Sequence, residues 1–83
     1  MESRSFIREA KVLIEDINAP VSNGSADEIA AHRKDLQRRI SSLFSGLQNP
    51  TLPSAFNLRD AALANGFVVA PPVLQRLASF DTV

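Results

Sequence analysis

The sequence contains no cysteine and only one histidine, His32, among its 83 residues. The absence of cysteine excludes disulfide bonds and thiolate metal sites, and one imidazole is too few for a histidine-rich metal site. The three glycines are isolated from one another, so the chain has no glycine-rich phosphate-binding loop. The lack of cysteine also fits a reducing compartment. We therefore expect no metal, no cofactor and a cytoplasmic location.

The sequence also has no excess of positive or negative charge, because nine basic residues are balanced by nine acidic residues. Strong binding to nucleic acids or acidic membranes depends on accumulated positive charge, which this composition does not supply. No apolar run approaches the roughly 20 residues that a membrane-spanning helix needs. The stretch 1–17 places acidic residues on both sides of its apolar positions, unlike a signal peptide. We expect neither a membrane segment nor a signal peptide.

The length of the chain predicts one domain, spanning 1–83, with a thin margin of stability. A domain of this size buries only about 60–65% of the surface that its unfolded chain exposes. Small domains usually compensate with a disulfide, a metal or a partner subunit. Because the first two are excluded here, we expect either close helix packing or association with a partner.

Proline and glycine divide the chain into four helical segments. They predict an all-α fold, namely a small bundle of three to four short helices with Pro/Gly-rich connections. The first two segments are expected to form an antiparallel helical hairpin at about 3–47. The first helix covers about 3–17, with Ser3 or Ser5 as its N-cap. Acidic residues in its last turn disfavour continuation of the helix.

The second helix gives the clearest signal in the sequence. It is predicted from about 26 to 44 or 47, and Ser25 with Glu28 forms a capping box at its start. Pro20 and Asn23-Gly24 break the chain before it. Its apolar residues recur at alternating steps of three and four residues, which is the period of one helix face.

This apolar face of the second helix must be buried, either within the chain or on a partner. It forms our predicted partner-binding surface, which consists of Leu36, Ile40, Leu43, Phe44 and Leu47. The sequence leaves open whether the apolar face over 29–47 belongs to the core of the chain or to an interface with a partner. Arg33 falls at an apolar position of the same repeat. It either fixes the register of a helix pair or lies at the helix edge with its charge in water.

The second half of the chain predicts a C-terminal helical hairpin at about 54–80. We expect its first helix to begin at Asn57, with Asp60 as the capping-box partner and Phe56 packed on Ala61 as a hydrophobic staple. Asn65-Gly66 ends this helix, since glycine favours the left-handed position that follows many helices.

An apolar, extended piece over 67–70 then leads to the last helix, with Pro72 at its first position. The buried side of this helix is expected to consist of Val73, Leu74, Leu77 and Phe80. Together, the four segments predict a shared core that contains Leu13, Ile17, Ile29, Leu36, Ile40, Leu43, Leu63, Phe67 and Leu77.

Catalytic chemistry has little support in this sequence. His32 lies within a predicted helix, one turn after Glu28, and this spacing is typical of a solvated pair on a helix surface. Nucleophilic catalysis needs a nucleophile together with a base and an orienting group, and no such set stands out. We expect no catalytic residues and no enzyme activity.

Two functional hypotheses follow from these patterns. The first is a non-enzymatic protein–protein interaction module, such as a small adaptor, chaperone, inhibitor or assembly subunit, which binds another protein or a second copy of itself by helix packing. The alternative is a DNA-binding regulator with a helix-turn-helix over 57–80, where Gln75 and Arg76 are the polar readers. The candidate contacts to nucleic acid or an acidic partner are Arg33, Lys34, Arg38, Arg39 and Arg76.

Overall fold

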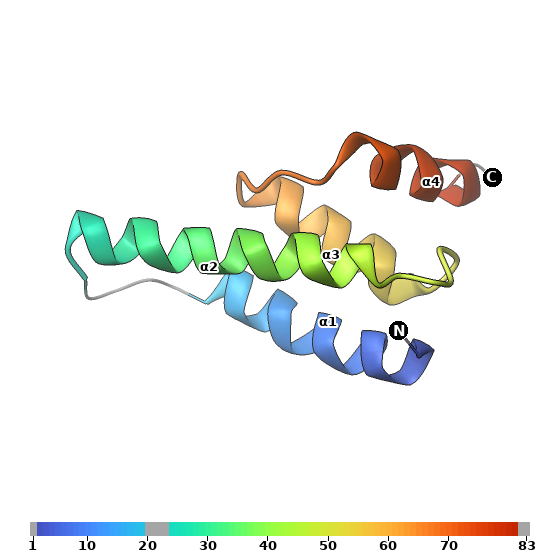
Figure 1. Cartoon of the computed structure of the whole chain (residues 1–83), viewed down its shortest axis with the longest axis horizontal. Coiled ribbons are helices and arrows are strands. Elements are labelled where there is room, and N and C mark those ends of the chain that lie inside the picture. The colour runs from blue at the N-terminus through green and yellow to red at the C-terminus, as the bar shows by residue number, and fades with distance from the viewer. Residues whose placement is uncertain (1, 20–23, 82–83) are drawn as a thin grey trace.

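The computed structural model describes residues 2–19 and 24–81, and these residues form four α-helices joined without a strand (Figure 1). The helices are α1 (Ser3–Asn18), α2 (Ala26–Ser45), α3 (Pro53–Ala64) and α4 (Pro71–Asp81). The predicted all-α fold is confirmed. None of these four helices is long and apolar enough to cross a membrane. The predicted breakers at positions 20–23 lie outside the described residues.

The first two helices run antiparallel, as predicted, with α4 on the opposite side of α2 from α1 (Figure 1). However, α1 packs mainly against α3, which crosses behind the hairpin. Fully buried alanines lie on both of these helices, Ala10 on α1 and Ala55 and Ala62 on α3. Such small side chains allow two helix axes to approach closely. The third helix therefore completes a core that the hairpin alone leaves open.

The starts of α1 and α2 differ in how far they follow the sequence signals. Ser25 caps α2 as predicted, because its Oγ accepts a hydrogen bond from the Glu28 N–H at 3.2 Å. The other half of the predicted capping box, a bond from the Ser25 N–H to the Glu28 side chain, is not formed. The predicted cap of α1 by Ser3 or Ser5 is wrong. Both serines lie inside the first turn, and Glu2 is the N-cap, with no side-chain hydrogen bond. Its carbonyl oxygen accepts the first helical bond from the Phe6 N–H at 3.0 Å.

The predicted start of the third helix at Asn57 is also wrong, because α3 begins four residues earlier, at Pro53. The fixed φ of proline suits the first helical position, where no N–H is needed. Asn57 and Asp60 are therefore interior helix residues, and Asp60 pairs with its neighbour Arg59 at 2.9 Å instead of capping the helix. Phe56 likewise lies within the helix, where its ring is 5.2 Å from the Arg59 guanidinium.

The end of α3 agrees with the prediction. Gly66 adopts a left-handed φ of 81°, and its N–H donates to the Leu63 carbonyl oxygen at 3.2 Å. The next N–H, of Phe67, donates to the Ala62 carbonyl oxygen at 2.9 Å. These two bonds form a Schellman motif, which satisfies carbonyl groups at the helix end. An irregular connection over 67–70 follows, and α4 starts at Pro71, one residue before the predicted position.

Most of the predicted core is confirmed. Seven of its nine residues are buried, namely Leu13, Ile17, Leu36, Ile40, Leu43, Phe67 and Leu77. The prediction was wrong for Leu63, whose side chain is 48% exposed, and for Ile29, which is half-buried near the start of α2. Leu58 and Ala62 lie on the side of α3 that faces the core. Leu63 lies on a different side of the helix, which is exposed.

The predicted buried side of the last helix is only partly correct. Leu77 is fully buried, and Val73 and Leu74 are half-buried against the core. Phe80 is 52% exposed, because it lies one turn beyond Leu77, near the end of α4.

Candidate functional site

The five residues predicted to bind a partner lie in the core of the chain. None of them is more than 6% exposed. These residues are Leu36, Ile40, Leu43, Phe44 and Leu47. The Phe44 ring packs on Phe6 of α1, with 6.4 Å between the ring centroids. The apolar face of α2 is therefore covered by the chain's own helices. In this conformation these side chains are core residues, and Leu43 also lines a surface groove.

That groove runs between α1 and α2 and has a volume of about 440 Å³. Its apolar lining residues, which we call the floor, are Val12, Leu13 and Leu43. Its polar lining residues, which we call the rim, are Arg8, Glu9, Arg39 and Ser42. Val12 is the only floor residue with a large accessible area, at 48% exposure. An apolar floor inside a charged rim is the usual composition of a site for a peptide or protein segment.

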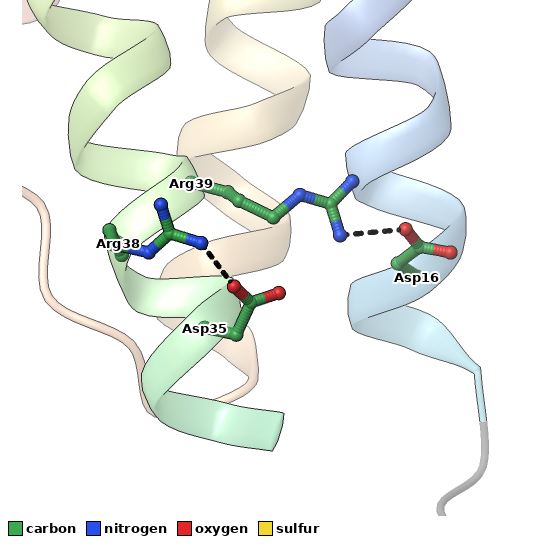
Figure 2. Close-up of polar contacts among 4 residues, drawn as sticks. All are labelled: Asp16, Asp35, Arg38 and Arg39. Carbon is green, nitrogen blue, oxygen red and sulfur yellow. Dashed lines mark hydrogen bonds and ion pairs between the residues drawn. The ribbon is translucent and has the colours of Figure 1, made fainter. Parts of the chain in front are cut away.

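An ion pair between the two helices lies beside the groove (Figure 2). Arg39 reaches from α2 to α1, where its Nη1 atom lies 3.0 Å from a carboxylate oxygen of Asp16. The neighbouring Arg38 instead pairs with Asp35 on its own helix, at 2.5 Å. The hydrogen bond from Arg38 holds the pKa of Asp35 below its ordinary value, and the positive charges nearby act in the same direction. Of these two consecutive arginines, Arg39 therefore links α2 to α1, and Arg38 forms an ion pair within α2.

The structure does not assemble the predicted basic residues into a free positive surface. Arg38 and Arg39 form the two ion pairs above, and Arg76 donates to the carbonyl oxygens that follow α2. Lys34 is exposed, and no hydrogen bond or ion pair joins it to the described residues. Together with Arg33, which binds the end of α3, four of the five candidate cations are engaged within the chain.

Arg33 reaches from α2 to the end of α3. Its guanidinium donates to the Asn65 carbonyl oxygen at 2.9 Å and lies 4.3 Å from the centre of the Phe67 ring. A cation over an aromatic face gains about 0.5–1 kcal/mol at an exposed site. Arg33 therefore lies at the edge of α2, but its guanidinium binds the end of α3 instead of extending into water as the helix-edge interpretation predicted.

Two further polar contacts were missed by the sequence analysis. The Gln37 side chain binds both backbone groups of Val68, and Asn65 donates to the side-chain oxygen of Asn18 at 3.2 Å and to the Ala61 carbonyl oxygen at 2.8 Å. No sequence signal could have found the contacts of Gln37 with Val68 and of Asn65 with Asn18, because these partners are more than 30 residues away along the chain. With Arg33, they fix the end of α3 and the connection that follows to α2 and α1.

A second hollow lies over these contacts. It is an open trough of about 650 Å³ between α2 and the end of α3, lined by Asp27, Ala30, Ala31, Arg33, Lys34, Gln37, Gly66 and Phe67. Its apolar lining consists of two alanines and the buried side chain of Phe67, so it has no large apolar side chain that is exposed. The α1–α2 groove has such a side chain in Val12, and we therefore take that groove as the candidate site.

No protein-family model matches the sequence, and neither a curated protein nor a solved structure resembles the chain significantly. In the two described stretches, no group of three or more histidine, aspartate or glutamate side chains is arranged to hold a metal ion.

Proposed function

We propose that the chain is a non-enzymatic protein–protein interaction module, whose partner presents an amphipathic helix to the groove between α1 and α2. The observation that carries this proposal is the apolar floor of the groove, where Val12 is exposed next to the buried side chains of Leu13 and Leu43. A groove between two helices suits a third helix that presents apolar side chains at spacings of three and four residues. An adaptor, a chaperone, an inhibitor and an assembly subunit all use this mode of contact.

The charges at the rim favour a partner helix with charged residues beside its apolar anchors. Arg8 and Glu9 are exposed and form no ion pair with the described residues, whereas Arg39 is already paired with Asp16. An acidic residue of the partner can therefore pair with Arg8, and a basic residue with Glu9. Exposed pairs of this kind contribute little affinity but select the orientation and the register of the partner.

The chemistry of the lining residues also supports binding over catalysis. Ser42 carries the only hydroxyl group in the groove, and the lining contains no histidine that could activate it. An unactivated serine is a weak nucleophile at neutral pH. The apolar residues are consequently the features of the groove that most affect a ligand.

A capture experiment with matched variants tests this proposal. The tagged chain is used to capture proteins from the native host lysate, with and without nuclease, and the bound proteins are identified by mass spectrometry. Val12→Glu places a charge on the groove floor, and Val68→Glu places the same charge at an exposed residue outside the groove. We expect a stoichiometric protein partner that survives nuclease, remains with Val68→Glu and is lost with Val12→Glu.

Two other outcomes would contradict the proposal. If both variants retain the partner equally, the groove is not the contact surface. If only nucleic acid is recovered, and only without nuclease, the helix-turn-helix hypothesis gains support instead. Sedimentation velocity of the purified chain distinguishes a foreign partner from a second copy, since self-association through the groove would also be lost with Val12→Glu.

A further inference from the structure

Helix α1 carries a short stripe of exposed residues along the α1–α2 groove. Arg8 and Val12 line the groove, and Glu15 continues the stripe one turn further along the helix. The steps of four and three residues place these three side chains on one side of α1. The stripe therefore consists of a cation, an exposed apolar side chain and an anion, in that order.

The two charged ends of this stripe are not paired within the described part of the chain. Arg8 and Glu15 are exposed, and neither forms an ion pair with a described residue. They lie two turns apart, roughly 10 Å along the helix axis, so they are too distant to pair with each other. The stripe thus presents one available charge of each sign, with Val12 between them.

A stripe of this kind is complementary to itself when two copies meet antiparallel. Two identical helices in an antiparallel contact are related by a two-fold axis, and each contact between them is made twice. When the axis crosses α1 midway between positions 11 and 12, Arg8 of each copy faces Glu15 of the other. Each Val12 then lies beside the axis, next to Val12 of the other copy.

The remaining charges of the rim are also compatible with this arrangement. Arg39 pairs with Asp16 on the C-terminal side of Val12 (Figure 2), whereas Glu9 lines the groove on the N-terminal side of Val12. The two-fold axis exchanges these two sides, so Glu9 of one copy approaches Arg39 of the other. Glu9, which forms no ion pair with a described residue, thereby gains a cation.

We propose that the occupant of the α1–α2 groove is helix α1 of a second copy, in an antiparallel, two-fold symmetric contact centred on Val12. This inference rests on the proposed function, because it names the partner helix for the same groove. The net charge of zero leaves no overall repulsion between copies. At its centre the contact covers one exposed apolar side chain per copy, so the dimer is a weak one that forms and dissociates readily.

An exchange of charges tests this contact. Sedimentation velocity of the full chain is measured at low salt, over roughly 10 µM to 1 mM. Arg8→Glu and Glu15→Arg each convert both attractive pairs into like-charge pairs, so each variant alone should dimerise at least about tenfold more weakly. An equal mixture of the two variants should associate as strongly as the unsubstituted chain, because both contacts of the mixed dimer again join opposite charges.

Two further variants control for the position of the contact. Val12→Glu should abolish the dimer, because it places two carboxylates at the axis. Val68→Glu should leave the dimer unchanged, since Val68 is exposed outside the groove. Circular dichroism should show the same helix content in all four variants, because each replaces an exposed residue.

Three results would overturn the inference: a monomer over the whole concentration range, self-association that Val12→Glu leaves unchanged, or a mixture that associates no better than its separate components. The proposed function fails in a different way. If the purified chain is monomeric but Val12→Glu removes a protein captured from lysate, the groove binds a foreign partner and only the second copy is wrong. If Val12→Glu changes neither capture nor self-association, both proposals are wrong.

Discussion

Gln37 binds Val68 through both ends of its side-chain amide. The Gln37 Nε2 atom donates to the Val68 carbonyl oxygen at 2.8 Å, and its Oε1 atom accepts from the Val68 N–H at 2.8 Å. One side chain thus gives the backbone the pair of hydrogen bonds that a neighbouring strand would supply. This contact holds the connection over 67–70 against α2 without a sheet.

Replacement of Gln37 by alanine should lower the free energy of unfolding by about 1 kcal/mol, because both hydrogen bonds are lost at a site open to water. The measurement is equilibrium unfolding in urea. Gln75→Ala is the control, since Gln75 is exposed on α4 and its side chain makes no hydrogen bond with a described residue. An equal effect of the two substitutions would show that the contact contributes nothing.

Two leucines of α3 should respond differently to truncation. Leu58 is fully buried, so Leu58→Ala should cost about 2–5 kcal/mol through lost burial and the cavity that remains. Leu63 is half-exposed, so Leu63→Ala should cost less than about 1 kcal/mol. Thermal unfolding of both variants provides the measurement. A larger effect at Leu63 would mean that α3 presents its other side to the core.

Alanine at Gly66 should destabilise the chain by about 1–2 kcal/mol, because the left-handed φ of 81° is unfavourable for a residue with a Cβ atom. Gly46 provides the contrast. Its φ of −91° is open to other residues, so Gly46→Ala should be neutral or stabilise the chain by about 0.4–1 kcal/mol through the unfolded state. Denaturant unfolding of both variants distinguishes the two cases, and equal losses would contradict this account.

The carboxylate of Asp35 should titrate below the ordinary range for aspartate, since the hydrogen bond from Arg38 favours its charged form. Because the folded pKa lies below the unfolded pKa, the contribution of Asp35 to stability is present above the unfolded value. It is lost as the pH falls through the folded value. Titration by NMR should show that Arg38→Ala raises the pKa of Asp35 more than Arg39→Ala does, since Arg39 acts only through its charge. The reverse order would disprove the assignment.

The sequence predicted those elements whose signals are local. Ser25 at the start of α2 and Gly66 after α3 each act on backbone groups within a few residues, so their patterns identified the helix ends. The start of α3 was missed because Asn57 and Asp60 match a capping box as well as residues at a true helix start do. The actual N-cap, Leu52, carries no side-chain signal.

A different reason explains why the sequence did not predict whether the apolar face of α2 is buried within the chain or on a partner. Periodicity shows that Leu36 and Ile40 must be buried, but it does not show which surface covers them. The cover comes from segments distant in sequence, such as α1 through Phe6. The groove has the same origin, because Val12 and Leu43 meet only after the two helices pack. Such contacts depend on tertiary structure, which spacing along one helix does not encode.

The packing of α1 on α3 also determines the order in which the chain can assemble during synthesis. Since a ribosome releases the chain from its N-terminus, α1 emerges first, and its main contact surface emerges only after the whole of α2. The apolar side of α1 is therefore only partly covered until residues 53–64 have been released. A nascent chain that pauses before this point leaves the side of α1 that packs on α3 open to chaperones and to neighbouring nascent chains. Release of the third helix closes this surface.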